Sequence, residues 1–152
     1  LSLREDTYIF GTMNPTSLRD YAGTQSLNKA FADRWVIWDK PFPNKEQLNT
    51  IFEKRYPKLQ KEYRDLIIKL ATEINNSFMS DDISINIETP MSLRTIVERI
   101  PIGLDVYAES SDPLKETWEN FVLPHVNKED LDHYKTLWNT IVRKGPSIKP
   151  KL

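Results

Sequence analysis

The sequence predicts a small α/β remnant followed by a mostly α-helical bundle. Two short apolar runs near the N-terminus, Tyr8–Phe10 and Trp35–Trp38, are rich in the aromatic and β-branched residues typical of strands. From residue 44 onward, apolar residues recur at every third or fourth position, which is the spacing of amphipathic helices. Two strands alone do not form a stable sheet, because about three or more with a covered face are needed. We therefore expect the α/β part to be the end of a larger sheet.

The composition is typical of a folded protein without a strongly charged surface. The 152 residues suffice for one domain or two small subdomains, and 39% of them are hydrophobic. A formal net charge of -1 gives no reason to expect a nucleic-acid or membrane surface from bulk electrostatics. The absence of cysteine rules out disulfides and thiolate metal sites and suits a reducing compartment, so we expect a cytoplasmic protein. No apolar run approaches the roughly 20 residues that span a bilayer.

We predict residues 1–43 to be the end of an α/β subdomain. Thr7–Thr12 is predicted to be a strand buried on both faces, because its apolar residues follow one another without alternation. Ser26 can cap a short helix whose apolar residues share one face: Leu27, Ala30 and Phe31. Trp35–Trp38 is the second predicted strand. Two prolines in Asp39–Pro43 then break regular structure, and we place the subdomain boundary there.

Residues 44–145 are predicted to form a bundle of about four or five helices. Asn44 caps the first helix, which Pro57 ends or restarts. A long amphipathic helix follows, with the core-facing residues Leu59, Tyr63, Leu66, Ile67, Leu70, Ile74 and Phe78. Beyond it, three isoleucines alternate with polar residues, which indicates an extended segment with one buried face: Ile83, Ile85 and Ile87.

Proline marks two further helices. Ser92–Ile100 is predicted to be a short helix that Pro101 closes, with Leu93, Ile96, Val97 and Ile100 facing inward. Asp112 followed by Pro113 is typical of an N-cap and the first position of a helix.

The last helix and the tail complete the predicted layout. Asn127 is predicted to cap this helix and Gly145 to end it. Residues 146–152 contain two prolines and are predicted to form a loose tail.

Three short elements of the N-terminal part form a recognisable pattern. Thr12-Met13-Asn14-Pro15 follows the first apolar run, Gly23-Thr24 comes next, and Asp33-Arg34 precedes the second run. This pattern resembles the MoxR-type AAA+ ATPases and their dynein-related and McrB-like relatives, over Thr7 to about Ile141. The resemblance implies that the chain is the C-terminal part of a P-loop AAA+ module, and that its helical part is the lid subdomain.

By this resemblance Asn14 is the catalytic sensor-1 residue. It lies just beyond the end of the predicted strand, where ligands sit in open parallel sheets. A carboxamide both donates and accepts hydrogen bonds, so it can contact a γ-phosphate oxygen and orient the attacking water. The alternative is an Asn-Pro turn in which Asn14 bonds its own backbone.

Arg34 resembles the arginine finger of the family, the second catalytic residue. Its guanidinium would enter the site of a neighbouring subunit and stabilise charge on the transferred phosphoryl group. Such fingers raise the rate by about 10³- to 10⁵-fold in other NTPases. The alternative is a surface or interface salt bridge, with Asp33 as one partner.

Arg94, in the Ser92-Leu93-Arg94 sequence at a predicted helix start, resembles the sensor-2 residue of the lid. Its planar guanidinium would bind the γ-phosphate and couple the lid angle to the nucleotide state. The alternative is a solvated arginine at a helix start, and Ser-Leu-Arg is a weak pattern on its own.

The sequence departs from the family in ways that limit its function. The phosphate-binding loop is absent, since only four glycines occur in the chain, and no apolar strand ends in the paired acidic residues that would hold magnesium. These residues therefore cannot bind and hydrolyse ATP unaided. The loop from Asn14 to Gly23 is also longer than usual for the family, and Trp35 replaces the common phenylalanine.

For the complete protein, the resemblance implies ATP and Mg²⁺ as cofactors. It further implies a homo-oligomeric ring, a hexamer, that remodels a protein or nucleic-acid partner. The alternative is a catalytically inactive helical interaction module of AAA+ ancestry. A third interpretation, a stand-alone nucleic-acid binder, is disfavoured by the charge balance.

The other candidate sites are weaker. His125 and His133 lie on different predicted elements without carboxylate or cysteine companions at ligand spacing, so we expect no zinc site. Asp81-Asp82 is read as a solvated turn, and Lys54-Arg55 with Lys61 and Arg64 as a solvated basic face.

Overall fold

The computed structural model describes residues 8–11, 30, 33–36, 40–80, 82, 85, 87–143 and 145–152. The chain divides into two compact units, Leu1–Lys40 and Pro41–Leu152. The division falls inside the proline-containing stretch where the sequence places a boundary.

The described residues of the first unit form no strand, so the predicted strands are wrong where they can be seen. Tyr8, Ile9 and Phe10 are largely exposed, and Val36 is 99% exposed. A stable strand needs neighbouring strands in a sheet with a covered face, and the described residues of this unit contain no strand. Ala30 is helical, as predicted. The other residues of that predicted helix, and the rest of residues 12–29, lie outside the described residues.

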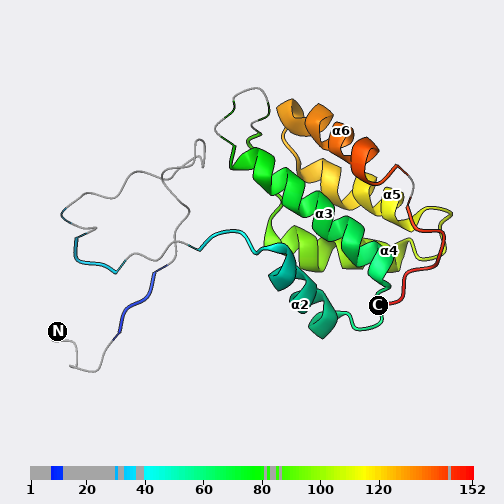
Figure 1. Cartoon of the computed structure of the whole chain (residues 1–152), viewed down its shortest axis with the longest axis horizontal. Coiled ribbons are helices and arrows are strands. Elements are labelled where there is room, and N and C mark those ends of the chain that lie inside the picture. Colours follow the sequence, from blue (N-terminus) through cyan, green and yellow to red (C-terminus); the bar gives the residue numbers. More distant parts are fainter. Residues whose placement is uncertain are drawn as a thin grey trace. The chain divides into compact units, whose positions relative to one another are not determined.

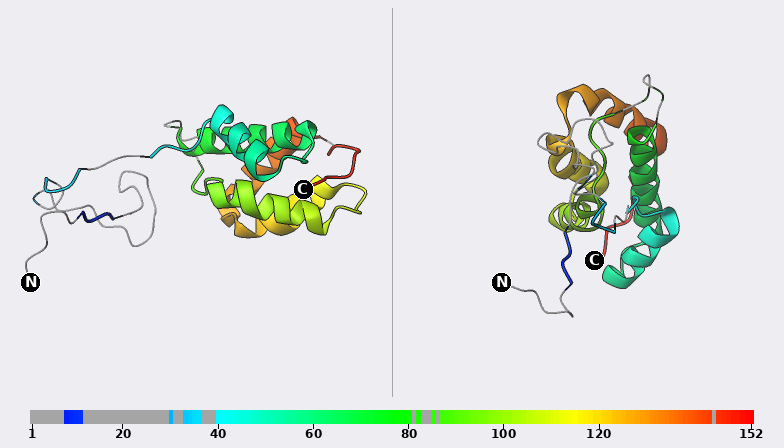
Figure 2. Two further views of the ribbon diagram at one scale, coloured as in Figure 1. Left: turned by 90° about the horizontal axis from the view of Figure 1, so that it is seen from below. Right: turned by 90° about the vertical axis from the view of Figure 1, so that its left-hand side faces the viewer.

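The second unit is a helical bundle, which confirms the coarser part of the predicted fold class. Its elements are α2 (Lys45–Arg55), α3 (Lys61–Phe78), the π-helical η1 (Thr95–Arg99), α4 (Ile100–Val106), α5 (Pro113–Thr117), the π-helical η2 (Trp118–Val122), the 3₁₀ turns η3 (Leu123–His125) and η4 (Lys128–Asp130), and α6 (Leu131–Ile141). Figure 1 shows α3 in the middle of the bundle, in contact with α2 and with α6. η1 runs directly into α4, and α4 packs against α5 and η2 (Figure 2).

The core of this unit lies between α3 and the helices around it. Of the residues predicted to face the core from this helix, Leu66 is only partly buried, Leu59 is buried but lies before α3 begins, and the others are buried in α3: Tyr63, Ile67, Leu70, Ile74 and Phe78. α2 contributes Leu48 and Phe52. Trp118 of η2 stacks on Trp138 and Tyr134 of α6, with ring centroids 4.9 and 5.8 Å apart. This aromatic stack packs η2 against α6.

Two helix starts follow from local sequence and are confirmed. The Asn44 side chain accepts from the Gln47 backbone N–H at 2.9 Å, and the Gln47 side chain accepts from the Asn44 N–H at 3.0 Å. This reciprocal capping box satisfies two of the free N–H groups at the start of α2. Asp112 accepts from the Lys115 N–H at 3.1 Å, and Pro113 occupies the first turn of α5.

The prediction that Pro101 closes a helix is wrong. The chain stays helical from Leu93 through η1 and α4 to Val106, and Pro101 lies in the first turn of α4. A proline lacks the N–H that would bond four residues back, to the carbonyl of Val97. That carbonyl instead accepts from the Tyr56 hydroxyl at 2.7 Å. The π turn and the tyrosine together let the helix pass through the proline.

Two predictions for residues 83–93 are wrong in part: that Leu93 faces the core, and that the isoleucines of the extended segment share one buried face. Leu93 is 38% exposed, because it lies in the first turn of its helix, before the buried face begins at Thr95. Ile85 is in a turn and 45% exposed, whereas Ile87 is buried. The predicted extended segment is therefore not a regular alternation, and Ile83 lies outside the described residues.

The predicted caps of the last helix are also wrong. The Asn127 side chain makes no capping bond, and the chain enters α6 through the 3₁₀ turn η4. α6 ends at Ile141, and the left-handed residue after it is Arg143, with φ 53°, instead of Gly145. Gly145 is buried against Asp112, where a Cβ would collide with the carboxylate oxygen Oδ1. A glycine is needed there for close packing, not to end the helix.

The C-terminal tail is bound to α3, so it is not loose. The Tyr63 hydroxyl donates to the Ile148 carbonyl at 2.8 Å. Gln60 donates to the Lys149 carbonyl at 2.6 Å and accepts from the Lys151 N–H at 3.1 Å. Figure 1 shows the C-terminus beside the start of α3, where these bonds lie.

No helix in the described part of the chain is both long and apolar enough to cross a membrane.

Candidate functional site

The three predicted site residues differ in what the structure says of them. Asn14 lies outside the described residues. Arg34 lies in an exposed turn of the first unit. Arg94 lies in the second unit, and its side chain is 77% exposed.

The backbone that carries Arg94 is fixed by an N-cap. The Ser92 hydroxyl accepts from the Thr95 N–H at 3.1 Å and lies 3.0 Å from the Thr95 hydroxyl. The Ser92 carbonyl accepts the first helical bond, from the Ile96 N–H, at 3.1 Å. Ser92 thus fixes where the helix starts, and it places Arg94 on the first, exposed turn.

Arg94 shares a carboxylate with a second arginine. Its Nε lies 4.0 Å from Glu98 Oε2, one turn further along the helix. Arg55 Nη1, at the end of α2, lies 3.6 Å from Glu98 Oε1. Both separations exceed the 2.7–3.2 Å of a direct N–H···O bond, so Glu98 holds both guanidinium groups loosely. We refer to Arg55, Glu98 and Arg94 as the arginine cluster.

The C-terminus of α2 is attached to the π turn beneath this cluster. Tyr56 donates to the Val97 carbonyl, as described above, and the Arg55 guanidinium lies 6.0 Å from the centroid of the Tyr56 ring. The ring of Tyr56 also packs on buried Phe52, with centroids 6.1 Å apart. Single π turns inside α-helices are frequent at functional sites. The two backbones that carry the arginine cluster are therefore held together by a part-buried bond.

A second polar connection fixes the chain just before Ser92. The buried Asn75 side chain, on α3, accepts from the Met91 N–H at 2.8 Å and donates to the Met91 carbonyl at 3.2 Å. An amide that bonds one residue in both directions fixes both the position and the direction of the backbone there. A signal for this was present in the sequence, because Asn75 is polar and follows Ile74 on the predicted apolar face of α3.

The third connection comes from α6 and the turn before it. Asp130 is 4% exposed, and its carboxylate accepts from the Thr89 N–H at 2.7 Å and from the Glu88 N–H at 3.1 and 3.2 Å. Tyr134 donates to the Thr89 carbonyl at 2.8 Å. Burial, and to a smaller extent the Asp130 carboxylate, raise the pKa of Tyr134 above its usual range, which keeps it a donor.

The role of Asp130 could not be predicted from the sequence, because it depends on distant residues. Its partners, Glu88 and Thr89, lie 42 and 41 residues away in the chain.

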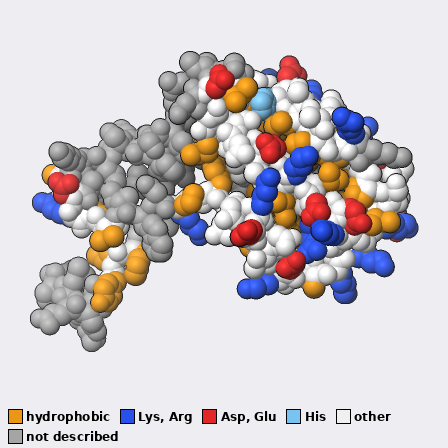
Figure 3. Space-filling view, in the orientation of Figure 1, with side chains coloured by type: hydrophobic (Ala, Val, Ile, Leu, Met, Phe, Trp, Pro, Cys, Tyr) orange, Lys and Arg blue, Asp and Glu red, His pale blue; other side chains and the backbone are white. Residues whose placement is uncertain are grey.

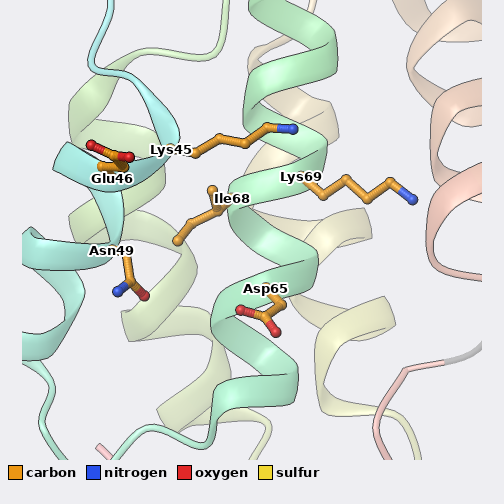
Figure 4. Close-up of a pocket in the computed structure, with 6 residues that line it drawn as sticks. All are labelled: Lys45, Glu46, Asn49, Asp65, Ile68 and Lys69. Atoms are coloured by element: carbon orange, nitrogen blue, oxygen red, sulfur yellow. The ribbon is translucent and has the colours of Figure 1, made fainter.

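An open groove of about 380 Å³ lies between α2 and α3 (Figure 4). Its lining residues are Lys45, Glu46, Asn49, Asp65, Ile68 and Lys69. This lining includes two lysines and two carboxylates, and in Figure 4 the Lys69 and Glu46 side chains point away from each other, so the groove favours neither an anion nor a cation. The face of the bundle in Figure 3 is mixed in the same way, with acidic and basic side chains interspersed.

The histidines play no part in a metal site that the described residues could form. Among these residues, no group of three or more histidine, cysteine or acidic side chains could hold a metal ion. His133 Nε2 lies 3.0 Å from the Ser77 hydroxyl, in a bond that joins α6 to α3.

Comparisons with protein-family models, with curated proteins and with solved structures found no match. The roles of Asn14, Arg34 and Arg94 therefore rest on the sequence pattern and, for Arg94, on its surroundings.

Proposed function

We propose that this chain is the C-terminal part of an AAA+ ATPase, which in a ring couples ATP hydrolysis to the remodelling of a macromolecular partner. The observation that carries the proposal is the ordered pattern Thr12-Met13-Asn14-Pro15, Gly23-Thr24 and Asp33-Arg34, followed by a helical bundle. In this proposal the bundle is the lid. ATP and Mg²⁺ are bound mainly by a half of the module that lies outside these 152 residues.

Each proposed residue has a separate role at the site. Asn14 orients the attacking water beside the γ-phosphate of its own subunit. Arg34 neutralises charge on the phosphoryl group held by the neighbouring subunit. Arg94 binds phosphate from the lid and so couples the lid to the nucleotide state.

The surroundings of Arg94 support its role. The side chain is exposed, its backbone is fixed by the Ser92 cap, and its ion pair with Glu98 is long. Exposed i,i+4 ion pairs contribute only about 0.3–0.5 kcal/mol, so the guanidinium can leave Glu98 at little cost. A phosphate, which takes two parallel N–H···O bonds from arginine, is a stronger partner.

The test uses the protein with its complete nucleotide-binding half and the substitution Arg34→Ala. ATP should still bind, because the finger belongs to the neighbouring site. Turnover should fall by at least about 10³-fold. Full turnover in Arg34→Ala would reject the finger assignment.

A second candidate is a helical interaction module of AAA+ ancestry without catalysis. It is favoured by Ile102 and Val106, which lie one turn apart on α4 and are 55% and 61% exposed. The coding sequence upstream of Leu1 separates the two candidates. A phosphate-binding loop and a strand ending in paired acidic residues support the ATPase, and their absence supports the interaction module.

A further inference from the structure

We propose that Arg55 and Arg94 form a two-arginine clamp for one phosphate group, and that Glu98 occupies this clamp until a phosphate displaces it. The inference rests on the proposed function, because it assigns Arg94 to phosphate. It adds Arg55 as a binding residue and Glu98 as the regulator of the same site.

The geometry of the carboxylate leads to this proposal. Arg55 approaches Oε1 of Glu98 and Arg94 approaches Oε2, so the two guanidinium groups flank one planar anion. Neither contact is a direct hydrogen bond at 3.6 and 4.0 Å, so most of the donor capacity of both arginines remains available. A phosphate offers three or more oxygens and a larger charge to the same pair of donors.

The charge of the cluster favours an added anion. Two arginines and one glutamate leave one net positive charge on three side chains that are 50%, 46% and 77% exposed. All three reach solvent, so an anion can enter without opening the core. Once phosphate takes its place between the arginines, Glu98 would remain nearby as a like charge and weaken the binding.

The backbone around the clamp is already in place. Tyr56 fixes the end of α2 to Val97, and Ser92 fixes the helix start that carries Arg94. Only the side chains need to move for phosphate to replace Glu98. This preorganisation reduces the entropic cost of binding.

Arg55 distinguishes the cluster from an ordinary surface ion pair. Lys115 and Glu119 form an i,i+4 pair of the same kind, at 3.9 Å with side chains 56% and 50% exposed. That pair has one cation for one anion and thus no positive charge to spare. Glu119→Gln therefore removes the same charge from a matched pair, and it serves as the control for Glu98→Gln.

The experiment titrates the 152-residue chain with inorganic pyrophosphate at constant ionic strength and follows the arginine Nε–Hε signals by NMR. We expect the Arg55 and Arg94 signals to shift along one saturation curve, with little change at Arg143. Glu98→Gln should tighten pyrophosphate binding by about threefold, because two weak ion pairs no longer compete. Glu119→Gln should leave the affinity unchanged.

Three results would overturn the clamp: no saturable shift at either arginine, a shift at Arg94 without one at Arg55, or equal affinities in Glu98→Gln and Glu119→Gln. The role that the proposed function gives Arg94 fails in a different measurement. If Arg94→Ala leaves ATP binding and turnover of the complete protein unchanged, Arg94 has no role at phosphate. If Arg94→Ala is impaired and Glu98→Gln has no effect, only the clamp is rejected.

Discussion

At the residue scale, the chain before Arg94 is positioned by a few buried polar side chains. Asn75, Asp130 and Tyr134 bond the backbone of Glu88, Thr89 and Met91 from two different helical segments. Buried polar groups contribute when all of them are paired and cost free energy when one partner is lost. Substitutions of these three side chains should therefore disturb the backbone of residues 88–91 and also lower the free energy of unfolding.

Asp130→Asn should destabilise the protein by about 1–3 kcal/mol, because an amide replaces one acceptor oxygen with a donor that faces the N–H groups of Glu88 and Thr89. Unfolding in urea measures the change. Asp132→Asn is the matched control, since Asp132 is exposed two residues further along α6. Equal stabilities for the two variants would show that the Asp130 bonds contribute nothing.

The raised pKa of Tyr63 predicts how the free energy of unfolding changes at alkaline pH. Burial, with a smaller effect of Asp112, raises its pKa from 10.0 to about 12. The folded protein holds this proton more tightly than the unfolded chain does. Its stabilising contribution is thus fully present below pH 10.0 and is lost as the pH rises through about 12. The urea midpoint should fall over this window.

Tyr63→Phe should be less stable at neutral pH, because it loses the bond to the Ile148 carbonyl, yet its midpoint should fall less steeply in the alkaline window. Tyr134 titrates in the same sense and leaves part of the slope in place. The same slope in Tyr63→Phe and in the native chain would contradict the assignment.

At the scale of the elements, features that depend on neighbouring residues in the sequence could be predicted, whereas features that depend on distant partners could not. The caps at Asn44 and Asp112 could be predicted, because each cap bonds a residue three positions along the chain. The continuation of the helix through Pro101 could not be predicted. The carbonyl of Val97, which Pro101 cannot bond, accepts instead from Tyr56, 41 residues away in the chain. The bonds of the C-terminal tail could not be predicted either, because its partners Gln60 and Tyr63 lie far away in the sequence, at the start of α3.

If the Tyr56 hydroxyl replaces the N–H that Pro101 lacks, the effects of substituting these two residues should be coupled. Tyr56→Phe should cost about 1–3 kcal/mol, because the Val97 carbonyl loses its donor. In the background of Pro101→Ala the same change should cost less, since the restored N–H can bond that carbonyl. A double-mutant cycle by urea unfolding gives the coupling energy. Additive effects would show that the proline and the tyrosine act independently.

At the scale of the whole molecule, the helical unit agrees with its prediction better than the first unit does. The helical unit matches the predicted lid in being a bundle, and it places Arg94 on a fixed and exposed helix start. In the first unit, the described residues form no strand, and Asn14 lies outside them. A strand predicted from a short apolar run depends on neighbours that local sequence does not supply. The sensor-1 and finger roles therefore remain predictions from the motif.

The central claim is that the motif is half of a site, with Asn14 acting in its own subunit and Arg34 in the next. The most direct test mixes two inactive variants of the complete protein, Asn14→Ala and Arg34→Ala, and measures ATP hydrolysis. In a randomly mixed ring, about a quarter of the interfaces join an intact Arg34 to an intact Asn14. We predict that mixing restores turnover to about that share of the native rate. If both variants bind ATP and assemble into mixed rings, yet the mixture stays inactive, the division of roles between neighbouring subunits is contradicted.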